Sequence, residues 1–129
     1  MPQQTTKLDN FTRAYIEAML WSSTDDKDRP IDANYSVSDL APETLARIVA
    51  DCEAFQTVHG GLFTSDNCKY DGCLVDEYAA HDFWLTRCGH GCGFWDGDWT
   101  EPAATVLTDA AHKYGNLDLY VGDDGLLYF

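Results

Sequence analysis

Five cysteines and four histidines are the residues of this chain that could support thiol or metal chemistry. Cys68 and Cys73 form one spaced pair and Cys88 and Cys92 another, in the manner of the paired thiolates that hold structural zinc. His90 lies inside the second pair and could replace one thiolate. Because neither pair has the common C-x2-C spacing, the first interpretation is free thiols and no cofactor. The alternative is a zinc site at Cys68, Cys73, Cys88 and Cys92.

His81 and Asp82 are neighbours that could support acid–base chemistry, because a carboxylate can orient an imidazole that titrates near neutral pH. Adjacent residues of a strand point to opposite faces, so this pair would not interact directly on the strand expected nearby. No set of nucleophile, base and orienting residue is recognisable. The prediction is a protein that is not an enzyme. A hydrolase-like enzyme that uses His81, His90 and the cysteines is the alternative.

Carboxylates are the most abundant chemically active groups: the chain has 22 acidic and 8 basic residues, for a net charge of −14. From Tyr70 onward the chain has eleven acidic residues and two basic ones, and many of the acids lie at expected turns. Carboxylates on a rigid scaffold can imitate DNA phosphates, which predicts a nucleic-acid mimic. The alternative interpretation is that the acidic surface only prevents aggregation. The predicted partner-binding residues are Asp76, Glu77, Asp82, Asp96, Asp98, Glu101, Asp118, Asp123, Asp124, Trp95 and Trp99.

This charge excludes several classes of partner. Phosphate backbones and anionic membranes repel an acidic protein, so neither nucleic acid nor membrane is expected to bind directly. No apolar run approaches the length of a membrane span, and no secretory signal is recognisable at the N-terminus. The expected partner is a basic protein or ribonucleoprotein complex that binds DNA or RNA in the cytoplasm.

Apolar residues recur at spacings of three and four in three segments, which predicts amphipathic helices over residues 8–21, 41–59 and 102–114. Cys52 lies on the apolar side of the second segment, where it is expected to act as a small core residue. Residues 74–80 are expected to form a short helical turn. Aromatic and glycine-rich runs predict two β-hairpins, with strands at residues 83–86, 93–95, 117–121 and 126–129.

These elements predict a single α+β domain. It would consist of an antiparallel sheet of about four strands, formed by the two hairpins, packed against two to three helices. The helical N-terminal part would span residues 8–60, and a hairpin–helix–hairpin part would span residues 81–129. At 129 residues the chain is long enough to bury a substantial core.

One motif is distinctive: residues 81–98 read HDFWLTRCGHGCGFWDGD. With DANYSV and LAPETL near residue 32 and DLYVGDDG near residue 118, it resembles a family of small acidic proteins of tailed bacteriophages that carry HDFWLTRxGHGxGFWDGD. The resemblance extends from the region of Phe11 to the C-terminus and implies action in the cytoplasm of an infected bacterial host. Most members have no assigned function. The family usually has Asn and Ala where this chain has Cys88 and Cys92, which argues against an essential role for those thiols.

The combined prediction is a phage-encoded acidic binding protein that inhibits a nucleic-acid-handling defence system of the host. Anti-CRISPR and antirestriction proteins are the expected types, and nucleic-acid mimicry is the expected mechanism. Two alternatives remain. The chain could be a small zinc-binding protein or enzyme, as described above, or a structural or accessory protein of the phage.

Overall fold

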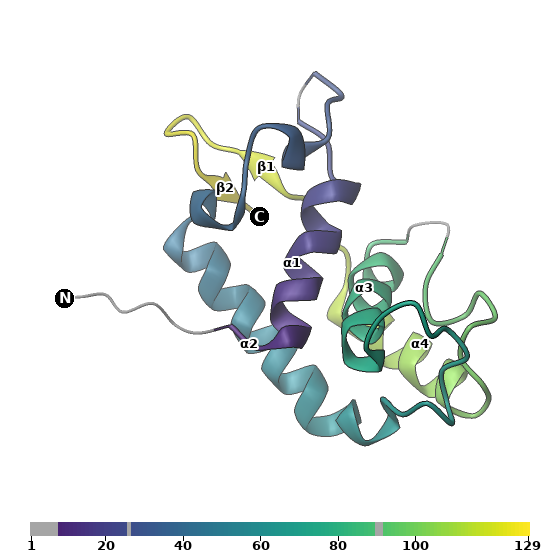
Figure 1. Ribbon diagram of the computed structural model, residues 1–129. Coiled ribbons are helices and arrows are strands. Elements are labelled where there is room, and N and C mark those ends of the chain that lie inside the picture. Colours follow the sequence, from purple (N-terminus) through teal and green to yellow (C-terminus); the bar gives the residue numbers. More distant parts are fainter. Residues whose placement is uncertain (1–7, 26, 90–91) are drawn as a thin grey trace.

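The computed structural model describes residues 8–25, 27–89 and 92–129. Over these residues the chain forms four α-helices and one two-stranded antiparallel sheet (Figure 1). The helices are α1 (Asn10–Ser22), α2 (Pro42–His59), α3 (Val75–Arg87) and α4 (Ala103–Tyr114), and the strands are β1 (Tyr120–Val121) and β2 (Leu127–Tyr128). Short 3-10 helices η1 (Ile31–Ala33), η2 (Val37–Asp39) and η3 (Gly60–Leu62) lie on either side of α2.

Three of the helices lie where the spacing of apolar residues predicts them. The Asp9 carboxylate accepts a hydrogen bond from the Thr12 amide at 2.8 Å and caps α1, whose buried side includes Phe11 and Tyr15. Pro42 occupies the first turn of α2, where a missing N–H costs little. Cys52 is fully buried on α2, which confirms its expected place in the core.

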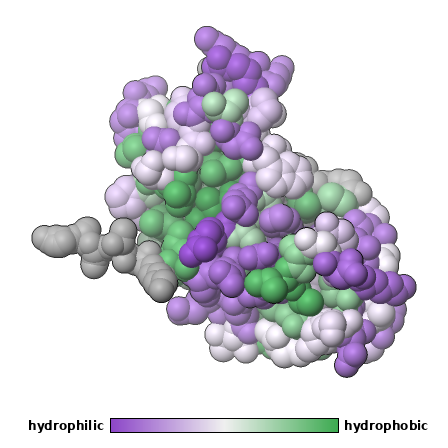
Figure 2. All heavy atoms as spheres, in the orientation of Figure 1, coloured by the Kyte–Doolittle hydropathy of each residue, from purple (hydrophilic) through white to green (hydrophobic). Residues whose placement is uncertain are grey.

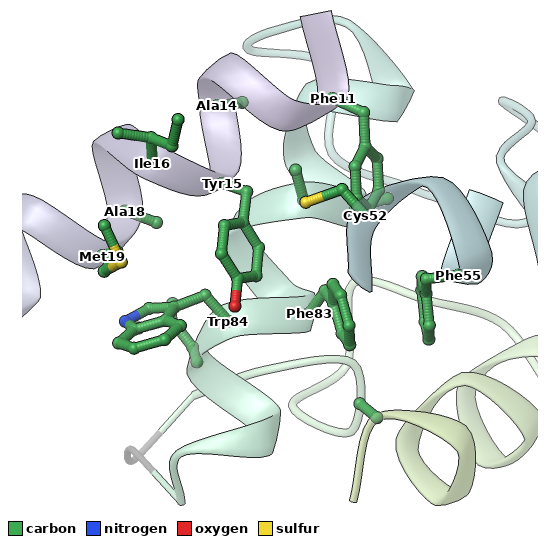
Figure 3. Packing of buried hydrophobic residues seen from close by; sticks show 14 of the residues in the cluster. Phe11, Ala14, Tyr15, Ile16, Ala18, Met19, Cys52, Phe55, Phe83 and Trp84 are labelled. Atoms are coloured by element: carbon green, nitrogen blue, oxygen red, sulfur yellow. The ribbon is translucent and has the colours of Figure 1, made fainter. Parts of the chain in front are cut away.

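The core is built mainly from aromatic side chains of α1, α2 and α3. Phe55 of α2 stacks on Phe83 of α3 with 4.0 Å between ring centroids, and Tyr15 of α1 packs beside Phe83 at 5.5 Å (Figure 3). The Trp84 and Tyr15 rings pack in a T-shaped arrangement, and the indole N–H of Trp84 donates to the Ser22 hydroxyl at 2.8 Å. These contacts fix α3 against α1, the pair that forms the centre of the molecule in Figure 1.

The predicted four-stranded sheet is wrong. Residues 83–86 do not form a strand but continue α3, which begins at Val75 and ends at Arg87, so the expected helical turn at 74–80 is its first half. The reason is tertiary packing: Phe83 and Trp84, neighbours on α3, both pack on Tyr15 of α1, and Ala79 and Ala80 one turn earlier are buried as well. Residues 93–95 lie in the loop between α3 and α4. The fold is mostly helical in the described residues and is not a four-stranded sheet packed on helices.

The C-terminal hairpin is present but shorter than expected. Tyr120 pairs with Tyr128 and Val121 with Leu127, and Gly125 adopts the positive φ of 79° that its turn requires. The Leu127 carbonyl also accepts hydrogen bonds from the Ala41 amide at 3.1 Å and the Thr44 hydroxyl at 2.9 Å. These bonds attach the hairpin to the start of α2.

None of the helices in the described ranges is both long and apolar enough to cross a membrane.

Candidate partner-binding surface

Two loops that are far apart in the sequence lie side by side and position most of the predicted binding residues. The Lys69 amide donates to the Asp98 carbonyl at 2.7 Å, and the Thr100 amide donates to the Asn67 carbonyl at 2.7 Å. Cys68 and Trp99 form an isolated antiparallel bridge between these loops. The bridge joins the segment before α3 to the segment before α4, so acidic residues of both loops lie together.

Carboxylates from these loops and the adjoining helices form what we term the loop surface. Its members are exposed or half-exposed: Asp66, Asp71, Asp76, Glu77, Asp96, Asp98, Glu101 and Asp109. Between residues 60 and 110 the sequence contains only two basic residues, Lys69 and Arg87. Arg87 is 3% exposed and is paired with Asp51 at 2.9 Å, so the exposed bases next to these carboxylates in the sequence are Lys69 and, one helical turn beyond Asp109, Lys113. Figure 2 shows hydrophilic residues along the edge formed by these loops.

Local hydrogen bonds orient several carboxylates of the loop surface. The Tyr78 hydroxyl donates to the Asp98 carboxylate, and the Tyr78 ring stacks on Tyr70 with 4.3 Å between centroids. Burial, followed by this hydrogen bond, raises the pKa of Tyr78 above its usual range. The Glu101 carboxylate accepts from the Thr105 amide at 3.0 Å and from the Thr105 hydroxyl at 2.7 Å. These bonds restrict where the negative charges point.

Asp82 and Trp99 do not lie on the surface. Trp99 is 4% exposed and Asp82 is 3% exposed, and the indole N–H of Trp99 donates to the Asp82 carboxylate at 2.8 Å. Burial raises the pKa of Asp82 to about 7, with a further contribution from the Asp96 and Asp98 carboxylates, against the opposing hydrogen bond from Trp99. The expectation that Asp82 and Trp99 contact a partner is therefore corrected: they form an interior polar contact.

Three of the four remaining predicted binding residues belong to a second surface at the C-terminal hairpin, whereas Trp95 is exposed in the loop between α3 and α4. Asp118, Asp123 and Asp124 are exposed there, and Tyr120 of β1 is 52% exposed. Asp124 accepts from the Tyr128 hydroxyl at 2.6 Å and from the Leu126 amide at 3.0 Å, which holds its pKa below the usual range. Figure 1 shows the hairpin and the loop between α3 and α4 at different ends of the molecule. The predicted acidic residues thus divide into two surfaces.

The cysteines are not arranged as the zinc alternative requires. The Cys68 thiol donates to the Tyr70 carbonyl at 3.8 Å, whereas the Cys88 thiol donates to the Leu117 carbonyl at 3.7 Å. Burial raises the pKa of the thiols of Cys68, Cys73, Cys88 and Cys92. All five cysteines are free thiols. Nowhere in the part of the chain that the structure describes do three His, Cys, Asp or Glu side chains gather as potential metal ligands.

The strand expected next to His81 and Asp82 is a helix in the structure. His81 lies on α3, and its neighbour Asp82 is bonded to Trp99 instead. Burial lowers the pKa of His81, while the nearby Glu17 and Glu77 act in the opposite direction. The ring atom Nε2 is buried without a hydrogen-bond partner among residues 8–25, 27–89 and 92–129. His90 lies outside the described residues.

Asp66, Asp71 and Asp109 of the loop surface are not among the partner-binding residues that the sequence analysis named. Asp109 is exposed on α4 opposite the buried residues Leu107 and Ala111, and this periodicity is a signal that the sequence alone contains. Asp66 and Asp71 join the loop surface through the pairing of Cys68 with Trp99, for which the sequence offers no local signal.

Comparison with known proteins finds no matching family model, no similar curated protein and no similar solved structure. The resemblance to small acidic phage proteins therefore remains a prediction from the motif of residues 81–98.

Proposed function

We propose that this protein binds a basic, nucleic-acid-handling component of a bacterial defence system by presenting the loop surface as a mimic of nucleic acid. The observation that carries the proposal is the concentration of eight exposed or half-exposed carboxylates, none of which forms an ion pair within 4 Å in the described residues. The resemblance to tailed-phage proteins supports the choice of a host defence component, of the anti-CRISPR or antirestriction type, as the partner.

The arrangement has a physical cost that binding to a basic groove would offset. Carboxylates that are close together repel one another, and this repulsion destabilises the compact state. Across the described residues, ion pairs within 4 Å involve only Asp25 and Asp51 among the acidic residues, and neither belongs to the loop surface. A partner rich in lysine and arginine would relieve the repulsion and would be attracted over long distances.

The test is recovery of the partner from the lysate of infected cells with the tagged full-length protein, followed by elution with increasing salt. We expect a basic DNA- or RNA-binding protein or complex that added nucleic acid displaces. Elution by moderate salt is expected because exposed charge pairs are screened over about 8–10 Å at physiological ionic strength. Recovery of virion proteins instead would contradict the proposal and favour a structural or accessory role.

A charge-reversal variant tests the assigned surface. Replacing Asp66, Asp71 and Asp96 with lysine should abolish recovery of the partner, because it reverses exposed charges at the centre of the loop surface. The matched control replaces Asp32, Glu43 and Glu53, which are equally exposed but lie on η1 and α2. Both variants change the net charge by the same amount. Equal loss of binding in both would show that total charge, not the loop surface, determines binding.

A further inference from the structure

A cavity of about 410 Å³ opens within the loop surface, between the loop that precedes α4 and α4 itself. Its lining includes Trp95, Trp99, Glu101, Thr108 and Asp109. The cavity therefore combines two indole rings with two carboxylates. Trp99 is buried, whereas Trp95 is 52% exposed and is the aromatic residue that a ligand can reach.

Exposure of the Trp95 indole is unfavourable for the isolated protein, since a large apolar side chain gains free energy when it is buried. Its neighbour Phe94 is fully buried and anchors this part of the loop to the core. The backbone position of Trp95 is therefore fixed although its side chain is exposed. The face of an indole ring attracts cations, and guanidinium groups stack on it most often.

The two carboxylates supply the charge that such a cation requires. Glu101 is oriented by the amide and hydroxyl of Thr105, which both bond its Oε1 atom. Its second oxygen has no hydrogen bond in the described residues, and the same holds for both carboxylate oxygens of Asp109. Lys113 is one helical turn beyond Asp109, yet these two residues form no ion pair within the 4 Å limit among the described residues.

Thr108, which lines the same cavity, provides a separate indication of an absent ligand. Its hydroxyl oxygen is buried, and no hydrogen-bond partner is present for it in the residues that the structure describes. A buried polar atom without a partner has lost its hydrogen bonds to water and gained none in return, which is unfavourable. A donor that enters the cavity would lie near this hydroxyl and could satisfy it after rotation of the side chain.

We propose that this cavity receives an arginine side chain of the basic partner, with the guanidinium stacked on Trp95 and bonded to Glu101 and Asp109. The inference rests on the proposed function. It adds one specific contact, the arginine site, to the general electrostatic attraction that the loop surface exerts on a basic partner. Arginine is favoured over lysine because its planar guanidinium both stacks on an aromatic ring and bonds carboxylates in a bidentate manner.

Titration calorimetry with an oligoarginine peptide and an oligolysine peptide of equal length tests the assignment. The full-length protein should bind the arginine peptide roughly tenfold more tightly, because the two peptides have the same charge but only guanidinium uses the stacked, bidentate geometry. Trp95→Ala should bring the ratio of the two affinities close to one, and so should the pair Glu101→Gln and Asp109→Asn. The glutamine retains an oxygen that can accept from Thr105.

The matched control is the pair Asp32→Asn and Glu53→Gln, which removes the same charge from other exposed positions and should preserve the arginine preference. Thr108→Val should reduce the preference by roughly threefold without lowering the free energy of unfolding, since it removes an unsatisfied hydroxyl. Equal affinity of the unaltered protein for both peptides would overturn the assignment, as would an arginine preference that survives the loss of Trp95.

The peptide titration and the recovery of a host partner can fail separately. If the cavity variants still recover the same partner with unchanged affinity, the arginine site is wrong and the proposed function stands. If the arginine preference depends on the cavity but no nucleic-acid-binding partner is recovered, the cavity assignment stands and the proposed function is wrong.

Discussion

At the scale of single residues, the buried carboxyl of Asp82 is the most unusual titratable group. It lies in the interior beside Trp99, with its pKa raised to about 7 from an ordinary value of 3.8, mainly because burial disfavours the ionised form. Its hydrogen bond with the indole N–H of Trp99 joins α3 to the loop before α4. The protonation state of Asp82 is therefore coupled to the stability of the scaffold that carries the loop surface.

This coupling predicts a dependence of stability on pH. Between pH 4 and 7 the folded chain binds a proton at Asp82 that the unfolded chain has released, so stability falls as the pH rises through this range. Asp82→Asn, which retains an acceptor for Trp99, should remove up to about 4 kcal/mol of this pH-dependent change in the free energy of unfolding. Urea unfolding at several pH values measures the difference, with Asp32→Asn as the control. Identical pH profiles for the Asp82 variant and the unaltered protein would refute the interior assignment.

At the scale of elements, one side chain connects all four helices. The Arg87 guanidinium, at the end of α3, donates to the carbonyls of Tyr114 and Gly115 at 2.8 Å each, which closes the C-terminal end of α4. It also donates to the Tyr15 hydroxyl of α1 at 3.2 Å and pairs with Asp51 of α2 at 2.9 Å. The helices are thus held in place by a buried charge as well as by aromatic packing.

Removal of this charge should strongly destabilise the fold. Arg87→Leu would leave the Asp51 carboxylate and two carbonyls without their donor, and breaking a buried ion pair in this way costs about 3–5 kcal/mol. Arg47→Leu is the control, because Arg47 is exposed and lies 3.7 Å from the same carboxylate, and its loss should cost less than about 1 kcal/mol. Chemical denaturation of both variants provides the comparison. Equal effects would mean that the Arg87 contacts contribute little.

The elements also differ in how readily they follow from the sequence. The spacing of apolar residues predicted α1, α2 and α4 because each has one buried side and one exposed side. It misassigned α3, since residues 82–87 are all buried and no exposed position interrupts the run. A short apolar and aromatic run is compatible with either a strand or a buried helix. Contact with α1 decided between them.

At the scale of the whole molecule, uncompensated negative charge is the dominant property. Raising the salt concentration from about 0.01 M to about 0.1 M shortens the screening distance from about 30 Å to about 10 Å, and so weakens repulsion among exposed carboxylates. Tm should therefore rise with salt. The increase should be smaller in the variant with Asp66, Asp71 and Asp96 changed to lysine than in the control altered at Asp32, Glu43 and Glu53. Calorimetric scans that show no rise, or the same rise in both variants, would contradict a concentration of repulsion at the loop surface.

The sequence by itself determined the acidic charge, the three amphipathic helices, the C-terminal hairpin and the burial of Cys52. These follow from composition and from patterns within a few residues of each other, which local sterics and the hydrophobic effect translate directly into structure. The abundance of carboxylates after residue 70 could likewise be counted before any fold was known.

Only the tertiary structure decided which carboxylates form one surface. Pairing of Cys68 with Trp99 brought the loop of Asp66 and Asp71 beside the loop of Asp96 and Asp98. Burial removed Asp82 and Trp99 from the surface, and the hairpin separated Asp123 and Asp124 from the rest. These outcomes depend on contacts between residues far apart in the sequence, whose stability comes from packing and desolvation in the assembled core. No local pattern encodes them, because the same side chain is exposed or buried according to what packs against it.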